Sequence, residues 1–270
     1  MDYITIVILG IVQGITEFLP ISSDGHLVIV AELLKLWRPQ QAQGLSSVAV
    51  IVALHIGTLM SILVVMRRQV LDLCKRRQLI VAVVLATIPL VIIGKPLKDL
   101  FEQWEKQAIF PLLAGIGLCI TSVLMSLCRR YETGSRTLQE VTSRDAILIG
   151  VFQAFAPLPG VSRSGSTIFA GLTRGLSREA AAQFSFLIAI PAILGAVVLH
   201  ARDMLKLTST GGEDLSVLGV GVLVSFLVGL VALKWLLKIV AKGQLKWFAW
   251  YCLIVGVSVI IWQTVVLSSK

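Results

Sequence analysis

The chain has 270 residues, of which 56% are hydrophobic and only 14% are charged, and its formal net charge is +9. Because soluble domains contain about a quarter charged residues, this composition excludes an ordinary soluble protein and predicts one integral membrane domain over residues 1–270. The basic excess fits cytoplasmic loops beside anionic lipid better than nucleic acid, since no compact basic run is interleaved with aromatic residues. We therefore expect the bilayer, and no nucleic acid, as a partner.

Long apolar runs follow one another along the chain, and most approach the ~20 residues that a helix needs to cross a bilayer. Two further regions, 1–37 and 146–173, are apolar but interrupted by proline, glycine and serine. The apolar arms on either side of each interruption are too short to cross the bilayer by themselves, which favours re-entrant hairpins. The sequence thus predicts an all-α integral membrane protein with about six transmembrane helices and two re-entrant helical hairpins. The long runs cover residues 48–66, 79–94, 108–128, 180–200, 215–237 and 247–267.

Basic residues concentrate in alternate loops. Loops 67–78, 129–144 and 234–246, together with Arg174 and Arg178, hold 15 of the 24 lysine and arginine residues. The other loops, 95–106 and 201–214, balance their basic residues with acidic ones. By the positive-inside rule the first set is cytoplasmic, so the first interrupted region enters the membrane from outside and the second from inside.

The two interrupted regions contain a similar segment twice, 140 residues apart. Residues 10–26 read GIVQGITEFLPISSDGH, and residues 150–166 read GVFQAFAPLPGVSRSGS. Because each half contains an odd number of spans, the second copy has the opposite orientation in the membrane. We therefore predict an inverted-topology repeat, with halves 1–130 and 141–268, whose hairpins meet near the midplane.

The first copy places Gln13 and Glu17 four residues apart, so on a helix their side chains share one face. Oxygen ligands presented together suit Mg²⁺ or Ca²⁺, whose remaining positions water and substrate phosphate can fill. Glu17 is alternatively a buried carboxyl that is simply protonated or paired. We favour a divalent-cation site at these two residues, because an ionisable residue inside the membrane is functional by default.

A polar stretch, residues 22–26, follows Pro20, which we expect to end the preceding helix. Ser22 and Ser23 ahead of an apolar run predict the start of the next helix, where backbone N–H groups bind anions. Ser23 and His26 could be a nucleophile and its base, or His26 could donate a proton to a leaving oxygen.

The second copy contains PGVSRSGST, residues 159–167, ahead of a short apolar arm. Arg163 offers a planar fork of donors suited to phosphate oxygens, and the neighbouring glycines let the backbone approach an anion closely. The alternative is an arginine that extends to the interface beside a serine cap. A permanent cation, small hydroxyls and a helix start together predict a phosphate site. His55, inside the 48–66 run, is a minor pocket candidate, since a lone histidine there is more often a core residue.

Together these motifs resemble the undecaprenyl-diphosphate phosphatase family of bacteria, also called the bacitracin-resistance protein family. The [E/Q]xxxE motif of that family corresponds to residues 13–17, its SSxGH motif to residues 22–26, and its PGxSRSxxT motif to residues 159–167. Order, spacing and hydrophobic layout match over nearly the whole chain.

The resemblance implies hydrolysis of undecaprenyl diphosphate to undecaprenyl phosphate and inorganic phosphate, which recycles the lipid carrier for peptidoglycan and other envelope polymers. It implies bacitracin resistance, a polyprenyl diphosphate substrate, a divalent cation and a homodimer. It also implies a site in the bacterial cytoplasmic (inner) membrane that opens toward the periplasmic or extracellular side. Carried over to this chain, Gln13 and Glu17 hold the metal, while Ser23 and His26 do nucleophile and acid/base work. The resemblance assigns diphosphate binding to Ser22, Ser162, Arg163, Ser164 and Thr167.

Two residues depart from the family pattern as it is carried over. Many members have Glu in place of Gln13 and Thr in place of Asp24, so we hypothesise that Asp24 partly replaces the missing negative charge. The rival function is a lipid-phosphate transporter, because inverted repeats and broken helices are typical of secondary transporters. The clustering of Glu17, Ser23 and His26 in the sequence favours the enzyme.

Overall fold

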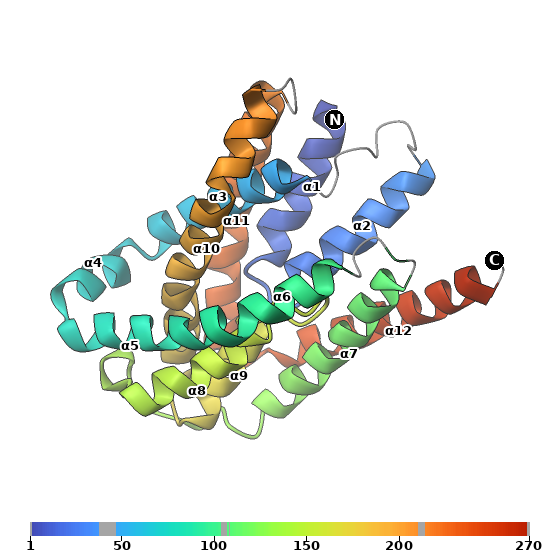
Figure 1. The fold of residues 1–270 in the computed structure, drawn as a ribbon. Helices are drawn as coiled ribbons and strands as arrows, with labels where there is room; N and C mark the ends of the chain where they lie inside the picture. The colour runs from blue at the N-terminus through green and yellow to red at the C-terminus, as the bar shows by residue number, and fades with distance from the viewer. Residues whose placement is uncertain (1, 38–46, 104–106, 108, 210–213, 269–270) are drawn as a thin grey trace.

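The computed structural model describes residues 2–37, 47–103, 107, 109–209 and 214–268, and the regular elements within these ranges are all helical (Figure 1). The elements in chain order are α1 (Tyr3–Thr16), α2 (Ser23–Trp37), α3 (Val48–Val65), α4 (Arg67–Lys75), α5 (Arg77–Pro89), η2 (Leu90–Gly94), α6 (Lys95–Glu102), α7 (Phe110–Cys128), η3 (Leu138–Glu140), α8 (Ser143–Ala154), α9 (Arg163–Thr173), α10 (Arg178–Ser209), α11 (Leu215–Ala241) and α12 (Lys246–Ser268).

In the described part of the chain, six helical stretches are long and apolar enough to cross a membrane. Each matches a predicted run, which confirms an all-α, multi-pass membrane protein. The stretch Arg77–Leu97 is longer than its predicted run of 79–94. Helix α5 reaches Pro89 and continues as the π-helix η2 instead of ending there. Proline disrupts the regular hydrogen-bond ladder, and a π-turn accommodates the disruption without breaking the span.

The predicted loop 67–78 was wrong in one respect, because most of it forms the helix α4. Val70 and Leu73 lie three residues apart and pack against the core, while Arg67 and Arg68 are exposed. The basic residues obscured this short amphipathic pattern, which suits a helix lying at a membrane interface.

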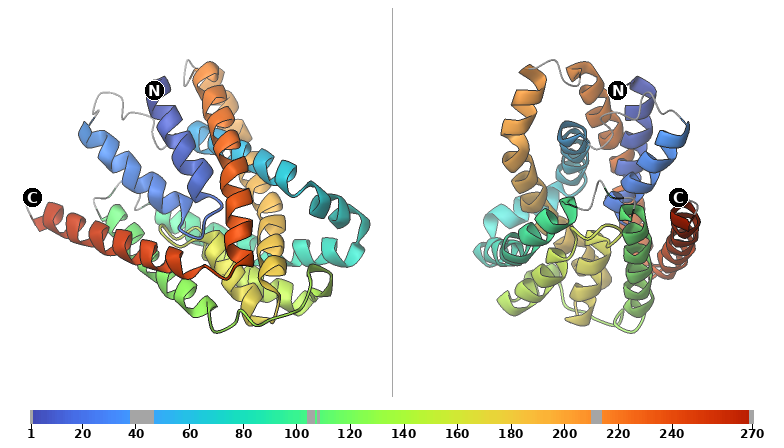
Figure 2. Two further views of the ribbon diagram at one scale, coloured as in Figure 1. Left: turned by 180° about the vertical axis from the view of Figure 1, so that it is seen from behind. Right: turned by 45° about the vertical axis from the view of Figure 1, so that its right-hand side comes forward.

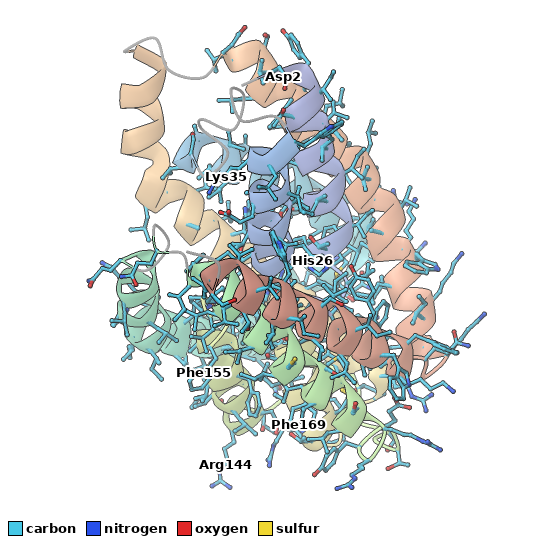
Figure 3. All side chains as sticks on the ribbon, turned by 90° about the vertical axis from the view of Figure 1, so that its right-hand side faces the viewer. Asp2, His26, Lys35, Arg144, Phe155 and Phe169 are labelled. Atoms are coloured by element: carbon cyan, nitrogen blue, oxygen red, sulfur yellow. The ribbon has the colours of Figure 1, made fainter. Side chains whose placement is uncertain are left out.

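The two interrupted regions form helical pairs, α1–α2 and α8–α9, that begin at opposite ends of the molecule. Asp2, just before α1, lies at one end in Figure 3, and Arg144, in the first turn of α8, lies at the other. His26, near the start of α2, lies between them. This is the arrangement that an inverted-topology repeat requires, although the duplication itself stays a prediction. Residues 104–106 and 210–213 of the two charge-balanced loops, and residue 108 of the predicted run 108–128, lie outside the described residues.

Each half of the chain packs closely against the other. Helix α3 runs along α11, α7 lies beside α12, α1 contacts α11, and α8 contacts α5 (Figure 2). Hydroxyl groups bond across these interfaces: Ser61 donates to the Phe226 carbonyl at 2.8 Å, and Ser122 donates to the Ala249 carbonyl at 2.7 Å. Small and hydroxylated residues let helices approach closely in lipid, where the hydrophobic effect does not drive association.

A charged cluster anchors the loop before α8 to the loop after α9. The buried Asp145 carboxylate accepts hydrogen bonds from Arg136 at 2.6 Å, from Arg174 at 2.7 Å and from the Thr142 hydroxyl at 2.7 Å. Backbone bonds join Arg136 to Gly175 and Ser177 on the other loop. Burial alone would raise the pKa of Asp145, but the donors from Arg136, Arg174 and Thr142 outweigh it and hold that pKa below its usual range.

Asp145→Asn is expected to lower the free energy of unfolding by about 2 kcal/mol, since hydrogen bonds to a charged group are lost. Because the folded-state pKa is depressed, this contribution is present above the ordinary value of 3.8 and is lost as the pH falls through the folded-state pKa. Thermal unfolding in detergent at pH 7 measures the effect. Glu140→Gln on the same loop is the control, because the Glu140 carboxylate bonds to Thr137 of its own turn and the substitution leaves its backbone carbonyl, which accepts from Arg136, in place. An unchanged melting temperature for Asp145→Asn would contradict the anchoring role.

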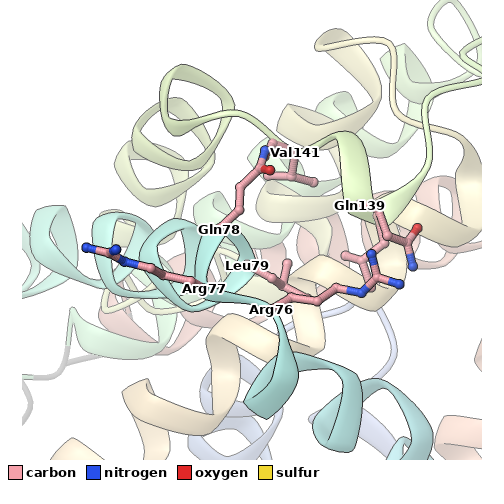
Figure 4. Close-up of a pocket in the computed structure, with 7 residues that line it drawn as sticks. Arg76, Arg77, Gln78, Leu79, Gln139 and Val141 are labelled. Atoms are coloured by element: carbon pink, nitrogen blue, oxygen red, sulfur yellow. The ribbon is translucent and has the colours of Figure 1, made fainter.

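Two cavities lie near this charged cluster. One of about 200 Å³ is bounded by the start of α5 and by η3 and its flanks (Figure 4). The other, of about 600 Å³, is lined by the residues of the charged cluster. No predicted site residue lines either cavity, so the motif residues must be judged from their own contacts.

Candidate active site

Glu17 lies just beyond the last turn of α1, where the first hairpin changes direction. Regular helix ends at Thr16, earlier than the expected end at Pro20, and turns lead from there to Ser22. Proline disfavours helical backbone at the residue before it, so the chain leaves the helix ahead of Pro20. The Glu17 side chain is 6% exposed, and a buried carboxylate at this depth requires partners.

The Glu17 carboxylate receives donors from both hairpins. Its Oε1 accepts a hydrogen bond from Nη2 of Arg163 at 2.6 Å. Its Oε2 accepts one from the Ser23 hydroxyl at 2.8 Å and one from Nε2 of Gln13 at 3.1 Å. The structure thus brings the two sequence motifs together at one carboxylate, across 146 positions of the chain.

His55 of α3 reaches the same carboxylate, with Nε2 lying 3.7 Å from Oε2 of Glu17. The sequence offered His55 only as a minor candidate, and its position beside Glu17 places it among the residues that surround the charged pair.

The start of α2 is held by Ser22 in a conformation that is unusual for serine. Ser22 has φ of 70°, and its hydroxyl accepts a hydrogen bond from the Gly25 N–H at 3.2 Å. A non-glycine residue in the left-handed region costs on the order of 1–3 kcal/mol and typically persists at functional sites. The predicted helix start is confirmed, and the strained backbone fixes where Ser23 points.

His26 is buried and is bonded through both ring nitrogens. Nδ1 donates to the Ser22 carbonyl at 2.8 Å, so in the neutral ring Nε2 accepts from the Tyr251 hydroxyl, also at 2.8 Å. The two rings are nearly parallel, with 9° between their planes. Of the two sequence-based alternatives, the Ser23–His26 pair therefore receives no support, because the Ser23 hydroxyl bonds to Glu17.

The hydroxyl residues of the second motif hold the hairpins in place. Ser162 caps α9 by accepting from the Gly165 N–H at 3.1 Å, and Ser164 donates to the Leu19 carbonyl of the first hairpin at 3.1 Å. Thr167 shares a 2.6 Å hydrogen bond with Ser185 of α10. All of these hydroxyls are buried, and their role in diphosphate binding stays a prediction.

Glycines bring the tips of the two hairpins into backbone contact. A Cβ atom on Gly25 would lie 2.8 Å from Cα of Gly160. Gly160 itself has φ of +83° and lies against α7, where its carbonyl accepts from Thr121 at 2.9 Å. Neither position can carry a side chain unless the backbone moves, so the site is built on a fixed junction.

Three contact residues had no signal in the sequence motifs: Thr121, Ser185 and Tyr251. Each lies in an apolar run, where spacing gives no hint of a polar partner. Asp24 is exposed in the first turn of α2, whereas Glu17 is buried. Its proposed compensation for Gln13 stays a hypothesis.

The donor set fits a divalent cation held partly by the protein. Oε1 of Gln13 is buried and has no hydrogen-bond partner, and Oε2 of Glu17 lies next to the same side chain. Within the described residues, no cluster of three or more histidine, cysteine, aspartate or glutamate side chains could hold a metal. One carboxylate and one amide suit a hard cation that completes its coordination with water and substrate phosphate.

Comparison with known proteins decides the family. Residues 6–258 match the family described as bacitracin resistance protein BacA. The chain belongs to this family. Three relatives, each named undecaprenyl-diphosphatase, are similar to the chain over nearly its whole length. That of Rhodopirellula baltica is 45% identical over 261 residues, covering 96% of this chain and 98% of the relative. Those of Carboxydothermus hydrogenoformans and Bacteroides thetaiotaomicron are 38% and 37% identical, with 97% of this chain covered in each case and 98% and 100% of the relatives.

Proposed function

We propose that this BacA-family protein hydrolyses undecaprenyl diphosphate to undecaprenyl phosphate and inorganic phosphate, and so confers bacitracin resistance by recycling the lipid carrier. The observation that carries the proposal is the buried cluster in which Glu17 of the first motif contacts both Ser23 and Arg163. Family membership and relatives that carry the name of this activity support it.

Arg163 binds the diphosphate. Two of its N–H groups contact Glu17 and the Ser185 carbonyl, the latter at 3.4 Å. A guanidinium has five N–H donors, so others are left for phosphate oxygens. Its permanent charge stabilises negative charge that develops on the transferred phosphoryl group.

Ser23 is the nucleophile and Glu17 is its base. The Ser23 oxygen attacks the terminal phosphorus while its proton passes to Oε2 of Glu17, with which it already shares a 2.8 Å hydrogen bond. The bond between the terminal phosphorus and the bridging oxygen breaks, and undecaprenyl phosphate leaves. Water then cleaves the phosphoserine, which releases inorganic phosphate and regenerates the Ser23 hydroxyl.

His26 supplies the proton for the leaving phosphate from its doubly protonated form, in which Nε2 donates a proton instead of accepting from the Tyr251 hydroxyl. Its ring is oriented by the Ser22 carbonyl and by the Tyr251 hydroxyl, so it is held in a fixed position apart from the Glu17–Ser23 bond. A separate base and acid suit this reaction, because Glu17 takes a proton from Ser23 while His26 gives one to the leaving phosphate.

Gln13 and Glu17 would hold a divalent cation, Mg²⁺ or Ca²⁺, through their oxygens. When bound, the cation neutralises phosphate charge and acts as a Lewis acid toward the transferred phosphoryl group.

The site opens to the periplasmic or extracellular side of the bacterial inner membrane. The basic segments around α4 and α8 lie away from the N-terminus (Figure 1), and the positive-inside rule places them in the cytoplasm. The α1–α2 and α8–α9 pairs enter from opposite ends, which supports an inverted-topology repeat. The resemblance to the family leads us to propose a homodimer as well.

Phosphate release from undecaprenyl diphosphate by the purified protein tests this function. We expect release that stops with EDTA and returns with excess Mg²⁺ or Ca²⁺, because the cation is chelated and then restored. Lipid transport measured in vesicles of the same preparation is the comparison. Transport without metal-dependent phosphate release would favour the transporter and contradict the proposal.

A further inference from the structure

His55 has one ring nitrogen whose surroundings do not match an ordinary hydrogen bond. Its Nδ1 lies 2.8 Å from the Ile51 carbonyl, four residues earlier in α3, and must donate the proton of that bond. In the neutral ring, Nε2 then presents a lone pair. The atom facing it is Oε2 of Glu17, 3.7 Å away, which is beyond hydrogen-bond distance and is also an acceptor.

A cation bound to both atoms would convert this repulsive contact into an attractive one. Bonds from a divalent transition ion to imidazole nitrogen and carboxylate oxygen are each about 2.0–2.2 Å long, and two such bonds can bridge the observed separation. Gln13 contacts the same Glu17 oxygen through Nε2, and its buried carbonyl oxygen has no partner. His55 and Gln13 therefore both lie beside Oε2 of Glu17, and Gln13 adds a carbonyl oxygen that has no partner.

The two oxygens of Glu17 divide the charged groups between them. Arg163 contacts Oε1, whereas Ser23, Gln13 and His55 lie on the side of Oε2. The guanidinium therefore does not occupy the position between Glu17 and His55.

We propose that His55 is a protein ligand of the divalent cation through Nε2, and that it shifts the cation preference of this chain from Mg²⁺ and Ca²⁺ toward Mn²⁺ and similar transition ions. Hard cations prefer oxygen ligands, whereas imidazole suits transition ions. The inference rests on the cation site proposed above and adds the ligand that determines its selectivity.

Electron paramagnetic resonance of the purified protein with Mn²⁺ alone tests the assignment. Pulsed spectra are expected to contain the nitrogen coupling of a directly bound imidazole. His55→Gln should remove that coupling and lower the Mn²⁺ affinity at least about tenfold, which is the smallest loss seen when even a supporting residue of a metal site is removed. The Ca²⁺ affinity should change less, because glutamine replaces the nitrogen with an amide oxygen. His26→Gln is the matched control and should keep the coupling.

The outcomes separate this inference from the cation site itself. If Mn²⁺ binds with an affinity that depends on Glu17 but without nitrogen coupling, His55 is not a ligand and the inference is overturned, which leaves a His55–Glu17 ion pair. Coupling that survives in His55→Gln and disappears in His26→Gln also overturns it. If Glu17→Gln leaves Mn²⁺ binding unchanged, or if no Mn²⁺ binds, the proposed cation site fails and the role of His55 fails with it.

Discussion

Arg163→Ala is expected to reduce phosphate release by about a thousandfold, which is the scale of loss when an arginine or an oxyanion donor is removed from a phosphoryl- or acyl-transfer site. Arg163 combines a permanent charge, a 2.6 Å bond to Glu17 and N–H groups available for the diphosphate. Steady-state phosphate release from undecaprenyl diphosphate in detergent measures the effect.

The alanine variant leaves Glu17 buried without its charged partner, which can cost about 3–5 kcal/mol of stability. Arg163→Lys avoids this problem because it keeps a positive charge beside Glu17. It should fold and still lose about a hundredfold in rate, since an ammonium cannot present the planar fork of donors. Arg68→Lys, on the exposed face of α4, is the control and should keep full activity. Near-normal release from Arg163→Lys would contradict the role of the guanidinium fork.

Glu17→Gln should reduce phosphate release by about a thousandfold, as expected for Arg163→Ala. It should also weaken the dependence of the rate on divalent cations. The amide keeps the shape of the side chain but cannot take the Ser23 proton or supply a negative charge to a cation. Phosphate release as a function of Mg²⁺ concentration measures both effects. Glu32→Gln is the matched control, because Glu32 pairs with Lys35 on the far part of α2 and is more exposed than Glu17.

The double variant Glu17→Gln, Arg163→Gln separates stability from catalysis. It removes both buried charges together, so it should recover much of the stability lost in Arg163→Ala, because no unpaired ion remains. It should stay inactive, since neither the base nor the phosphate ligand is present. Recovered phosphate release in this variant would show that the pair serves the fold alone.

Much of the fold was predictable because membrane spans depend on one strong property, the apolar length of a helix. The runs near residues 110–128 and 215–241 needed only composition. Helix α4 was missed because its two core-facing residues, Val70 and Leu73, are outnumbered by basic neighbours. The predicted run 79–94 continues through Pro89 in the structure, because tertiary packing, not local preference, decides whether a membrane helix survives a proline.

The site was predictable wherever a motif kept costly residue types close together in the sequence. Glu17, Ser23 and Arg163 were all candidates, and the structure brings them into contact. The sequence could not pair Ser23 with Glu17 rather than His26, because that choice depends on the direction of the chain after Pro20. Tyr251 lies 225 positions from His26, and only the packing of α12 brings its hydroxyl there.

The backbone contact between Gly25 and Gly160 has a consequence for the route that reactants take. Because the two chain tips touch there without side chains between them, a bulky headgroup cannot pass between Gly25 and Gly160. We therefore expect the diphosphate to enter the site, and the freed phosphate to leave it, on the same side of this contact. An enzyme of this kind needs no alternation between open states on the two sides of the membrane.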